Sequence, residues 1–332
     1  MNVWNAVLDV NDPVSTRVQL VQKEMRAILL DSRALPEWMV DDLFTEAESC
    51  LRALLVLVAG EAANAARESL DNVMQAAISL ELLYWANRLH DLMGDGGLLR
   101  RGAWEGWTGA HGGFDPVLLG DFLFTRGLSR VAKLPASVFR AFSELTAQLI
   151  LEKMHVRDGV FGGLETTERE YLERAYAKSP MILAIGCKVG AQLGGCPSEV
   201  KEALTAYGYS LGMALQIQQD LQDLTQNGAR VGTAVFYNLH DKVLPLPVIH
   251  SLQNSSALRK LLSARFSALR PVARNSLLRC LEASGSIDYT LEVARSYLNK
   301  ARASLSAVPA SEAKELLFHL VDTLTEQMNA KG

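Results

Sequence analysis

The stretch LHDLMGDGGLLRRG, residues 89–102, ends a long apolar pattern and brings acidic and basic side chains together. Asp91 and Asp95 are four residues apart, so both carboxylates leave one face if the segment is helical. Two carboxylates on one face suit Mg²⁺, which takes oxygen ligands and often keeps phosphate oxygens in its coordination shell. Arg100 and Arg101 follow, and guanidinium groups suit phosphate oxygens. Acidic pairs at this spacing are also common on solvated helix ends, so the stretch alone leaves both interpretations open.

A second polar pattern, GMALQIQQDLQD, covers residues 212–223. Asp220 and Asp223 are three residues apart, which places them on one face of a helix. The residues before them are apolar and rich in glutamine, which is unusual for an exposed stripe. A helix with one polar flank remains an alternative interpretation. The pattern by itself does not place residue 91 near residue 220.

Apolar residues recur at three- and four-residue steps along nearly the whole chain, and alternating runs typical of strands are absent. The predicted helical segments are residues 14–31, 36–64, 68–93, 115–132, 138–154, 166–194, 197–226, 243–252, 255–265, 270–283, 286–305 and 309–329. No shift in composition marks a domain boundary. We therefore predict an all-α fold of about a dozen helices, larger than a four-helix bundle, in a single domain over residues 1–332.

The composition excludes several classes of protein. The chain has 332 residues, of which 49% are hydrophobic and 21% charged, with a net charge of −4. Without a basic block, this balance argues against a nucleic-acid partner. The four cysteines have neither metal-ligand nor disulfide spacing. The N-terminus lacks the basic start of a signal peptide, and no apolar run is long enough for a transmembrane segment. These features predict a cytoplasmic protein.

The succession of motifs resembles the trans-isoprenyl diphosphate synthases, or polyprenyl synthetases, over nearly the whole chain. Residues 89–102 resemble the family's His-Asp-Asp-x-x-Asp followed by Arg-Arg-Gly, and residues 215–223 resemble its Phe-Gln-Ile-x-Asp-Asp-x-x-Asp. Four further matches follow in the family's order: residues 118–123 with Leu-x-Gly-Asp-Tyr-Leu, Lys178-Ser179 with a Lys-Thr pair, Pro245 with Thr-Leu-Pro, and the tail over residues 285–313. One such match would be weak, whereas six in the right order are specific.

In that family, Mg²⁺ ions between the two motifs hold an allylic diphosphate, and a deep apolar cavity houses the growing chain. The resemblance therefore implies the isoprenoid synthase fold, an allylic isoprenyl diphosphate substrate and Mg²⁺ as cofactor. It assigns metal contacts to Asp91, Asp95, Asp220 and Asp223. It assigns catalytic roles at the diphosphate and the cation to Lys178, Gln216 and Arg100. The substrate-binding residues that it implies are Arg52, Tyr84, Asn87, Arg100, Arg101, Lys178, Ser179 and Gln216.

The sequence departs from the family pattern at both motifs and at the acceptor pocket. Leu92 stands where the first motif has its middle aspartate, and Gln219 replaces the first aspartate of the second motif. Of the family's Gly-Gly-Lys-Arg-x-Arg-Pro, only Arg52 is kept, with Ser49 in place of the lysine. Tyr84 occupies the position of a histidine. We therefore expect a pocket that binds a second diphosphate poorly.

Three functions are compatible with these departures. The chain is an active prenyltransferase with a modified acceptor site, taking isopentenyl diphosphate or an uncharged nucleophile. In an intramolecular variant, it is a terpene cyclase. Alternatively, it is a non-catalytic or regulatory subunit of a heteromeric polyprenyl diphosphate synthase. All three imply a dimer, either of this chain with itself or with a complete synthase subunit.

Overall fold

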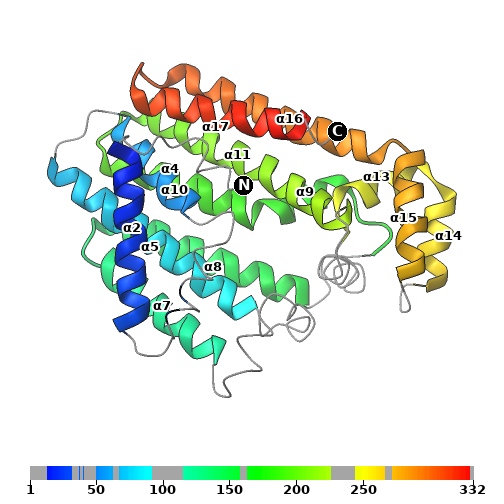
Figure 1. Ribbon diagram of the computed structural model, residues 1–332, viewed down its shortest axis with the longest axis horizontal. Coiled ribbons are helices and arrows are strands. Elements are labelled where there is room, and N and C mark those ends of the chain that lie inside the picture. Colours follow the sequence, from blue (N-terminus) through cyan, green and yellow to red (C-terminus); the bar gives the residue numbers. More distant parts are fainter. Residues whose placement is uncertain are drawn as a thin grey trace.

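The chain, represented by a computed structural model, is built from helices packed around each other (Figure 1). The structure describes residues 13–31, 50–62, 67–91, 115–157, 163–225, 244–265 and 271–329, together with Glu37 and Val40. Every regular element within these ranges is helical. The predicted all-α class is therefore confirmed for the described part of the chain.

The elements follow one another with short connections wherever the structure describes them. They are α2 (Pro13–Asp31), α4 (Leu51–Glu61), α5 (Arg67–Asp91), α7 (Pro116–Val131), α8 (Ala136–Arg157), α9 (Glu168–Tyr176), α10 (Ser179–Leu193), α11 (Ser198–Thr225), α13 (Leu246–Asn254), α14 (Ser256–Arg265), α15 (Pro271–Ala283), α16 (Ser286–Ser304), the 3₁₀ turn η2 (Leu305–Ala307) and α17 (Glu312–Asn329).

Helix α10 lies at the centre of the bundle, in contact with α4, α5, α8, α9 and α11. Its sequence is mostly apolar, and it buries side chains on every turn, although Lys188 is exposed. A helix that is apolar over most of its surface must be covered by several neighbours, which explains its position. Helices α16 and α17 run along the outside of α11, and α14 and α15 form one end of the molecule (Figure 1).

The predicted helical segment over residues 166–194 is wrong in one respect, because the structure divides it into α9 and α10. The chain turns at Ala177 and Lys178 before α10 starts at Ser179. Pro180 explains the break. A proline has no N–H to donate and is tolerated only in the first turn of a helix, which is where Pro180 stands.

The beginning of α10 lies directly against α11. A Cβ atom added at Gly212 would sit 2.4 Å from the Cα of Pro180, so only glycine allows this approach. Gln216 follows one turn later on α11. The packing therefore brings Lys178 and Ser179 close to the second motif.

Candidate functional site

The first motif begins at the C-terminal end of α5. Asp91 is the last residue of this helix, whereas Asp95, Arg100 and Arg101 lie outside the described residues. Asn87 precedes Asp91 by four residues and therefore shares its face of the helix. The structure describes only the backbone of Asp91, so its metal role stays a prediction.

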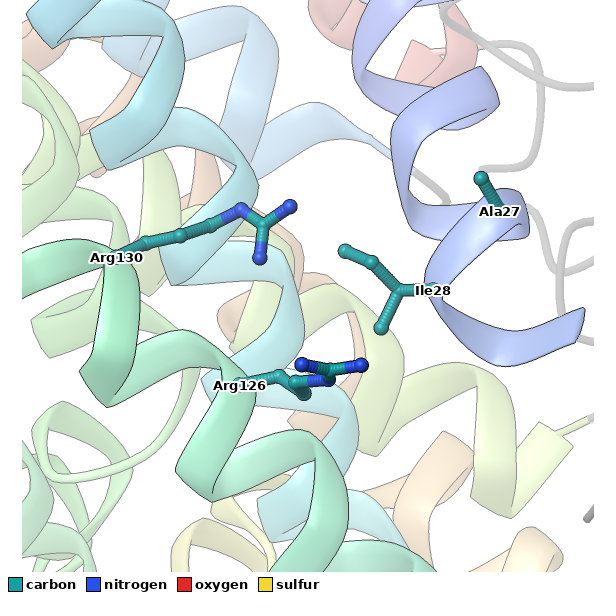
Figure 2. Close-up of a pocket in the computed structure, with 4 residues that line it drawn as sticks. All are labelled: Ala27, Ile28, Arg126 and Arg130. Carbon is teal, nitrogen blue, oxygen red and sulfur yellow. The ribbon is translucent and has the colours of Figure 1, made fainter. Parts of the chain in front are cut away.

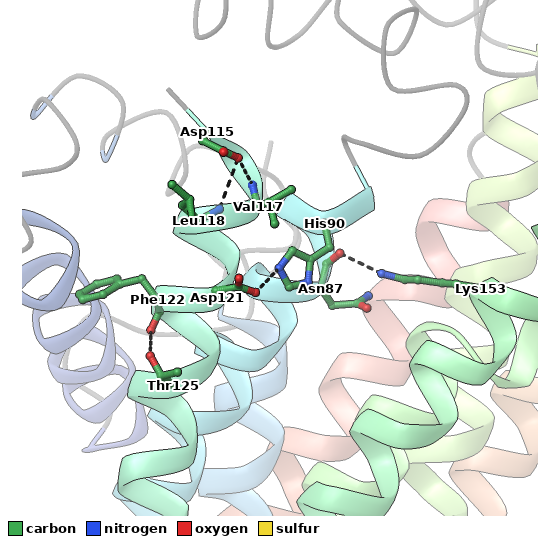
Figure 3. Close-up of polar contacts among 9 residues, drawn as sticks. All are labelled: Asn87, His90, Asp115, Val117, Leu118, Asp121, Phe122, Thr125 and Lys153. Atoms are coloured by element: carbon green, nitrogen blue, oxygen red, sulfur yellow. Dashed lines mark hydrogen bonds and ion pairs between the residues drawn. The ribbon is translucent and has the colours of Figure 1, made fainter. Parts of the chain in front are cut away.

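Lys153 of α8 reaches the end of α5 (Figure 3). Its Nζ donates a hydrogen bond to the backbone oxygen of Asn87 at 3.1 Å. In an α-helix this same carbonyl accepts the N–H of the residue four positions later, which here is Asp91. The ammonium group of Lys153 therefore lies beside the backbone of the first motif. A cation is also favourable there because the carbonyl end of a helix carries partial negative charge.

His90 explains why residues 118–123 contain a Gly-Asp pair. His90 Nε2 lies 3.2 Å from Asp121 Oδ1 on α7 (Figure 3). A Cβ atom at Gly120 would lie 2.4 Å from the same imidazole nitrogen. Gly120 therefore makes room for the ring and Asp121 faces it. This contact fixes α7 against the end of α5.

Arg52, the retained residue of the predicted acceptor pocket, belongs to a buried cluster between α4 and α5. Its Nε donates to Glu81 Oε2 at 2.9 Å, and Glu81 Oε1 accepts the N–H of Ala53 at the same distance. The Arg52 guanidinium also lies 3.4 Å from the centre of the Tyr84 ring. Arg52 is 3% exposed and Glu81 is fully buried. The predicted substrate roles of Arg52 and Tyr84 thus fall on two side chains that already contact each other.

The second motif forms a hydrogen-bonded network around Asp220 of α11. Tyr171 of α9 donates its hydroxyl to Asp220 Oδ2 at 2.8 Å, and Gln216 Nε2 donates to Asp220 Oδ1 at 2.9 Å. Both oxygens of this predicted metal ligand therefore accept bonds from the protein. Gln219 is exposed and Asp223 is half-buried.

Arg174 of α9 connects the second motif to α8. The guanidinium is 3% exposed, and its Nη2 donates to the backbone oxygen of Leu244 at 2.7 Å. Burial lowers the pKa of Arg174, while the negative charges of Asp220 and Glu152 oppose this change. Arg174 therefore lies within electrostatic range of both carboxylates.

Glu152, at the end of α8, lies among positive side chains. Burial raises the pKa of the Glu152 carboxyl, and the nearby charges of Lys178, Arg174 and His155 act in the opposite direction. Lys178 itself is exposed at the turn before α10. Residues from three distant parts of the sequence thus meet at one end of the bundle.

One hydrogen bond and a series of charge interactions relate the two motifs. Lys153 bonds to the backbone of Asn87. Its neighbour Glu152 is within electrostatic range of Lys178 and Arg174, and Arg174 is within electrostatic range of Asp220. The first and second motifs, which the pattern alone could not place together, are linked in this way through α8 and α9.

The donors within the described residues do not by themselves assemble a metal centre. No group of three or more His, Cys, Asp or Glu side chains lies close enough to hold a metal ion in this part of the chain. Asp220 is surrounded by a hydroxyl, an amide and a guanidinium group. The groups around Asp220 do not fit a metal ion, whereas the metal roles of Asp91, Asp95 and Asp223 stay predictions.

A separate groove of about 490 Å³ lies between α2 and α7. Figure 2 shows its lining, with Ala27 and Ile28 on one side and Arg126 and Arg130 on the other. The Arg130 guanidinium lies 3.7 Å from Glu24. None of these residues belongs to the predicted site.

The sequence interpretation did not include Lys153, Glu152, Tyr171 or Arg174. A signal was present for Arg174, because the buried face of α9 consists of Tyr171, Arg174 and Ala175. An arginine on the buried stripe of a short helix indicates a partner inside the protein. No comparable signal marks Lys153, whose partner is a backbone carbonyl on another helix.

The chain belongs to the polyprenyl synthetase family, whose model matches residues 37–281. The geranylgeranyl diphosphate synthase of Methanosarcina mazei is 29% identical over 280 residues, with 82% of this chain and 83% of that protein covered. Component 2 of the heptaprenyl diphosphate synthase of Bacillus subtilis is 24% identical, with 80% and 75% covered. The predicted family is thereby confirmed.

A solved structure extends the similarity to the fold. The polyprenyl synthase of Caulobacter crescentus, crystallised with calcium and isoprenyl diphosphate, has a TM-score of 0.76 and 25% identity. The comparison covers 94% of this chain and 97% of that one. The chain therefore has the fold of the polyprenyl synthases. Its relatives are prenyl diphosphate synthases, which supports the expectation of a prenyltransferase.

Among the described helices, none combines the length and the apolar character that crossing a membrane requires.

Proposed function

We propose that this chain binds an allylic isoprenyl diphosphate and ionises it with the help of Mg²⁺. The observation that carries the proposal is the hydrogen bond from Lys153 of α8 to Asn87 on α5, together with the charge interactions that relate Glu152, Arg174 and Asp220 on α11. These interactions relate the two motif-bearing helices at the end of the bundle where Lys178 is exposed. The Caulobacter relative with calcium and isoprenyl diphosphate supports the same substrate class.

In this proposal the acidic and basic side chains have separate roles. Asp91 and Asp95 would hold Mg²⁺, which supplies positive charge to the departing diphosphate. Arg100, Arg101 and Lys178 bind the diphosphate oxygens. These charges act where negative charge develops as the carbon–oxygen bond breaks.

Gln216 is positioned for the other product of ionisation, the allylic cation. Its Nε2 points at Asp220, so its carbonyl oxygen is directed away from that carboxylate. The oxygen end of an amide dipole stabilises positive charge. Asp220 therefore serves to orient Gln216, and Tyr171 holds Asp220 in place.

We further propose that the acceptor site is modified. Arg52 is paired with Glu81 and covered by Tyr84, and Ser49 replaces a lysine of the family motif. A second diphosphate would find fewer charge-assisted contacts, each of which contributes about 1.5–3 kcal/mol. The acceptor is then weakly bound isopentenyl diphosphate, an uncharged nucleophile, or a double bond of the substrate itself, as in a cyclase.

A second candidate function is that of a subunit in a heteromeric synthase. The similarity to component 2 of the Bacillus subtilis heptaprenyl diphosphate synthase favours it. So do the exposed apolar side chains on α7 and α8, which are Val117, Leu118, Phe139, Ile150, Leu151 and Met154. Association with a second chain, as a homodimer or with a complete synthase subunit, would cover side chains of this kind.

The deciding experiment measures diphosphate release from geranyl or farnesyl diphosphate in the presence of Mg²⁺. The purified chain is assayed with and without isopentenyl diphosphate, and with and without a complete synthase subunit. Release by the chain alone supports the first function. No release by the chain alone in any combination contradicts it, and release only after addition of the second subunit supports the subunit function.

Two carboxylate variants control the assay, one within the first motif and one outside both motifs. Asp91→Ala should abolish release, and unchanged turnover would contradict the metal role of Asp91. Asp288→Ala changes a carboxylate on α16, outside both motifs, and should leave release unchanged.

A further inference from the structure

Arg174 lies near the second motif, which the sequence predicts to be a metal site, because its guanidinium packs against the ring of Tyr171, whose hydroxyl bonds to Asp220. Asp220 accepts one hydrogen bond on each oxygen, from Tyr171 and from Gln216. Gln219, which replaces an acidic residue of the family motif, is exposed and neutral. The motif has therefore lost one acidic ligand, and the protein itself supplies donors to another.

The Arg174 guanidinium is fixed in this position. It is 3% exposed, and the backbone oxygen of Leu244 accepts from its Nη2 at 2.7 Å. The Tyr171 ring lies 5.7 Å from the guanidinium carbon, so the residue that bonds Asp220 also packs against the cation. Arginine stays protonated at all ordinary pH values. The second motif consequently contains a permanent positive charge.

A buried cation is stable only if negative groups compensate it. Asp220 and Glu152 are the carboxylates whose charges act most strongly on Arg174. A divalent ion bound at Asp220 would be repelled by the charge of Arg174, which already acts on this carboxylate. It would also have to displace the hydrogen bonds from Tyr171 and Gln216.

We infer that Arg174 takes the place of a metal ion at Asp220, so that this part of the second motif works without metal. Resting on the proposed function, the inference removes Asp220 from the metal ligands and leaves metal binding to the other predicted ligands. Asp220 remains important, as the partner of Arg174 and the anchor of Gln216. A fixed guanidinium supplies one positive charge where a metal ion would supply two.

The inference is tested by counting bound metal. Mn²⁺ replaces Mg²⁺, and the free ion is followed by electron paramagnetic resonance in the presence of saturating inorganic diphosphate. Asp220→Asn should keep the number of bound ions and their affinity within about twofold of wild type. Loss of a bound ion, or an affinity lowered tenfold or more, would overturn the inference.

A thermal double-mutant cycle, in buffer with a chelator, tests the coupling without metal. Arg174→Met should lower Tm by roughly 6–10 °C, because it removes a buried cation and leaves the half-buried carboxylates of Asp220 and Glu152 without it. Adding Asp220→Asn should recover part of this loss. Additive effects of the two changes would overturn the inference, even if the wild-type chain binds no metal.

Arg169→Met is the matched control. Arg169 lies on the same helix and pairs with Glu173 at the surface, so its removal should leave Tm and Mn²⁺ binding unchanged. The proposed function is tested separately. A chain that releases no diphosphate from farnesyl diphosphate would contradict that function, while the ion count and the cycle would still decide the role of Arg174.

Discussion

Two clusters in this molecule combine an arginine, a tyrosine and a carboxylate, and they differ in how completely their polar groups are paired. Between α4 and α5, Glu81 is fully buried and accepts from Arg52 and from the backbone of Ala53. Between α9 and α11, Asp220 accepts from Tyr171 and Gln216, with Arg174 nearby.

The second cluster contains buried polar groups that have no hydrogen-bond partner. Within the described part of the chain, Arg174 Nη1 and Glu152 Oε1 are buried without a hydrogen-bond partner. Buried groups of this kind are rare, and a catalytic role or a bound water or ion can explain them. The first cluster therefore acts as a structural joint, whereas the second can respond to a ligand.

The largest expected effect is on stability, at the first cluster, around Glu81. Glu81→Gln leaves the buried Arg52 without its counter-ion and should lower the free energy of unfolding by about 3–5 kcal/mol. Urea denaturation followed by circular dichroism measures the change. Glu173→Gln removes an exposed pair on α9 and should cost at most about 0.5 kcal/mol. Equal effects of the two variants would refute the structural role of the first cluster.

Next in size is an effect on catalysis at the second cluster, around Asp220. Tyr171→Phe removes the hydroxyl that holds Asp220 and so loosens Gln216. We expect kcat for diphosphate release to fall about tenfold, since one such bond contributes about 1–1.5 kcal/mol. Tyr176→Phe, at the exposed end of the same helix, should leave kcat unchanged. A loss of Tm without loss of kcat in Tyr171→Phe would assign this cluster to stability as well.

A smaller effect, on substrate binding, is expected at Lys153, the neighbour of Glu152 in the second cluster. Lys153→Met removes the ammonium group beside Asp91 and should raise KM for the allylic diphosphate about fivefold, a loss of about 1 kcal/mol. Lys153→Arg should restore most of the binding. Lys133→Met, in the exposed turn between α7 and α8, provides the control. If Lys153→Met changes only Tm, Lys153 merely caps α5.

The smallest effect concerns pH. Burial raises the pKa of Glu152 in the folded chain, so the folded state holds this proton more tightly than the unfolded state. The stabilisation is present at low pH and is lost as pH rises through the folded-state pKa. Glu152→Gln should therefore raise Tm at pH 7 relative to wild type, by roughly 1 °C because solvent screens the half-buried carboxyl. At pH 4 the difference should vanish. A larger gain at pH 4 would contradict the assignment.

The helices were largely predictable from the sequence, because periodicity is a local property. The predicted segments at residues 68–93 and 197–226 correspond to α5 and α11 within two residues at each end. The break before α10 was missed, although Pro180 is the residue that requires it. The four site residues that were missed depend on contacts between helices.

Long-range pairing is what the pattern could not supply. The ion pair of Arg52 with Glu81 joins two helices, and the hydrogen bond from Lys153 ends on a backbone carbonyl that has no sequence signature. The family resemblance brought the two motifs together but carried no information on Arg174. Asp95, Arg100 and Arg101 lie outside the described residues, so their roles stay predictions.

The most direct test of the proposed function measures diphosphate release from farnesyl diphosphate, in the presence of Mg²⁺, by the purified wild-type chain and by Asp91→Ala. We predict release by the wild-type chain without any second subunit, and none by the variant. Equal release by both, or release by neither, would contradict it.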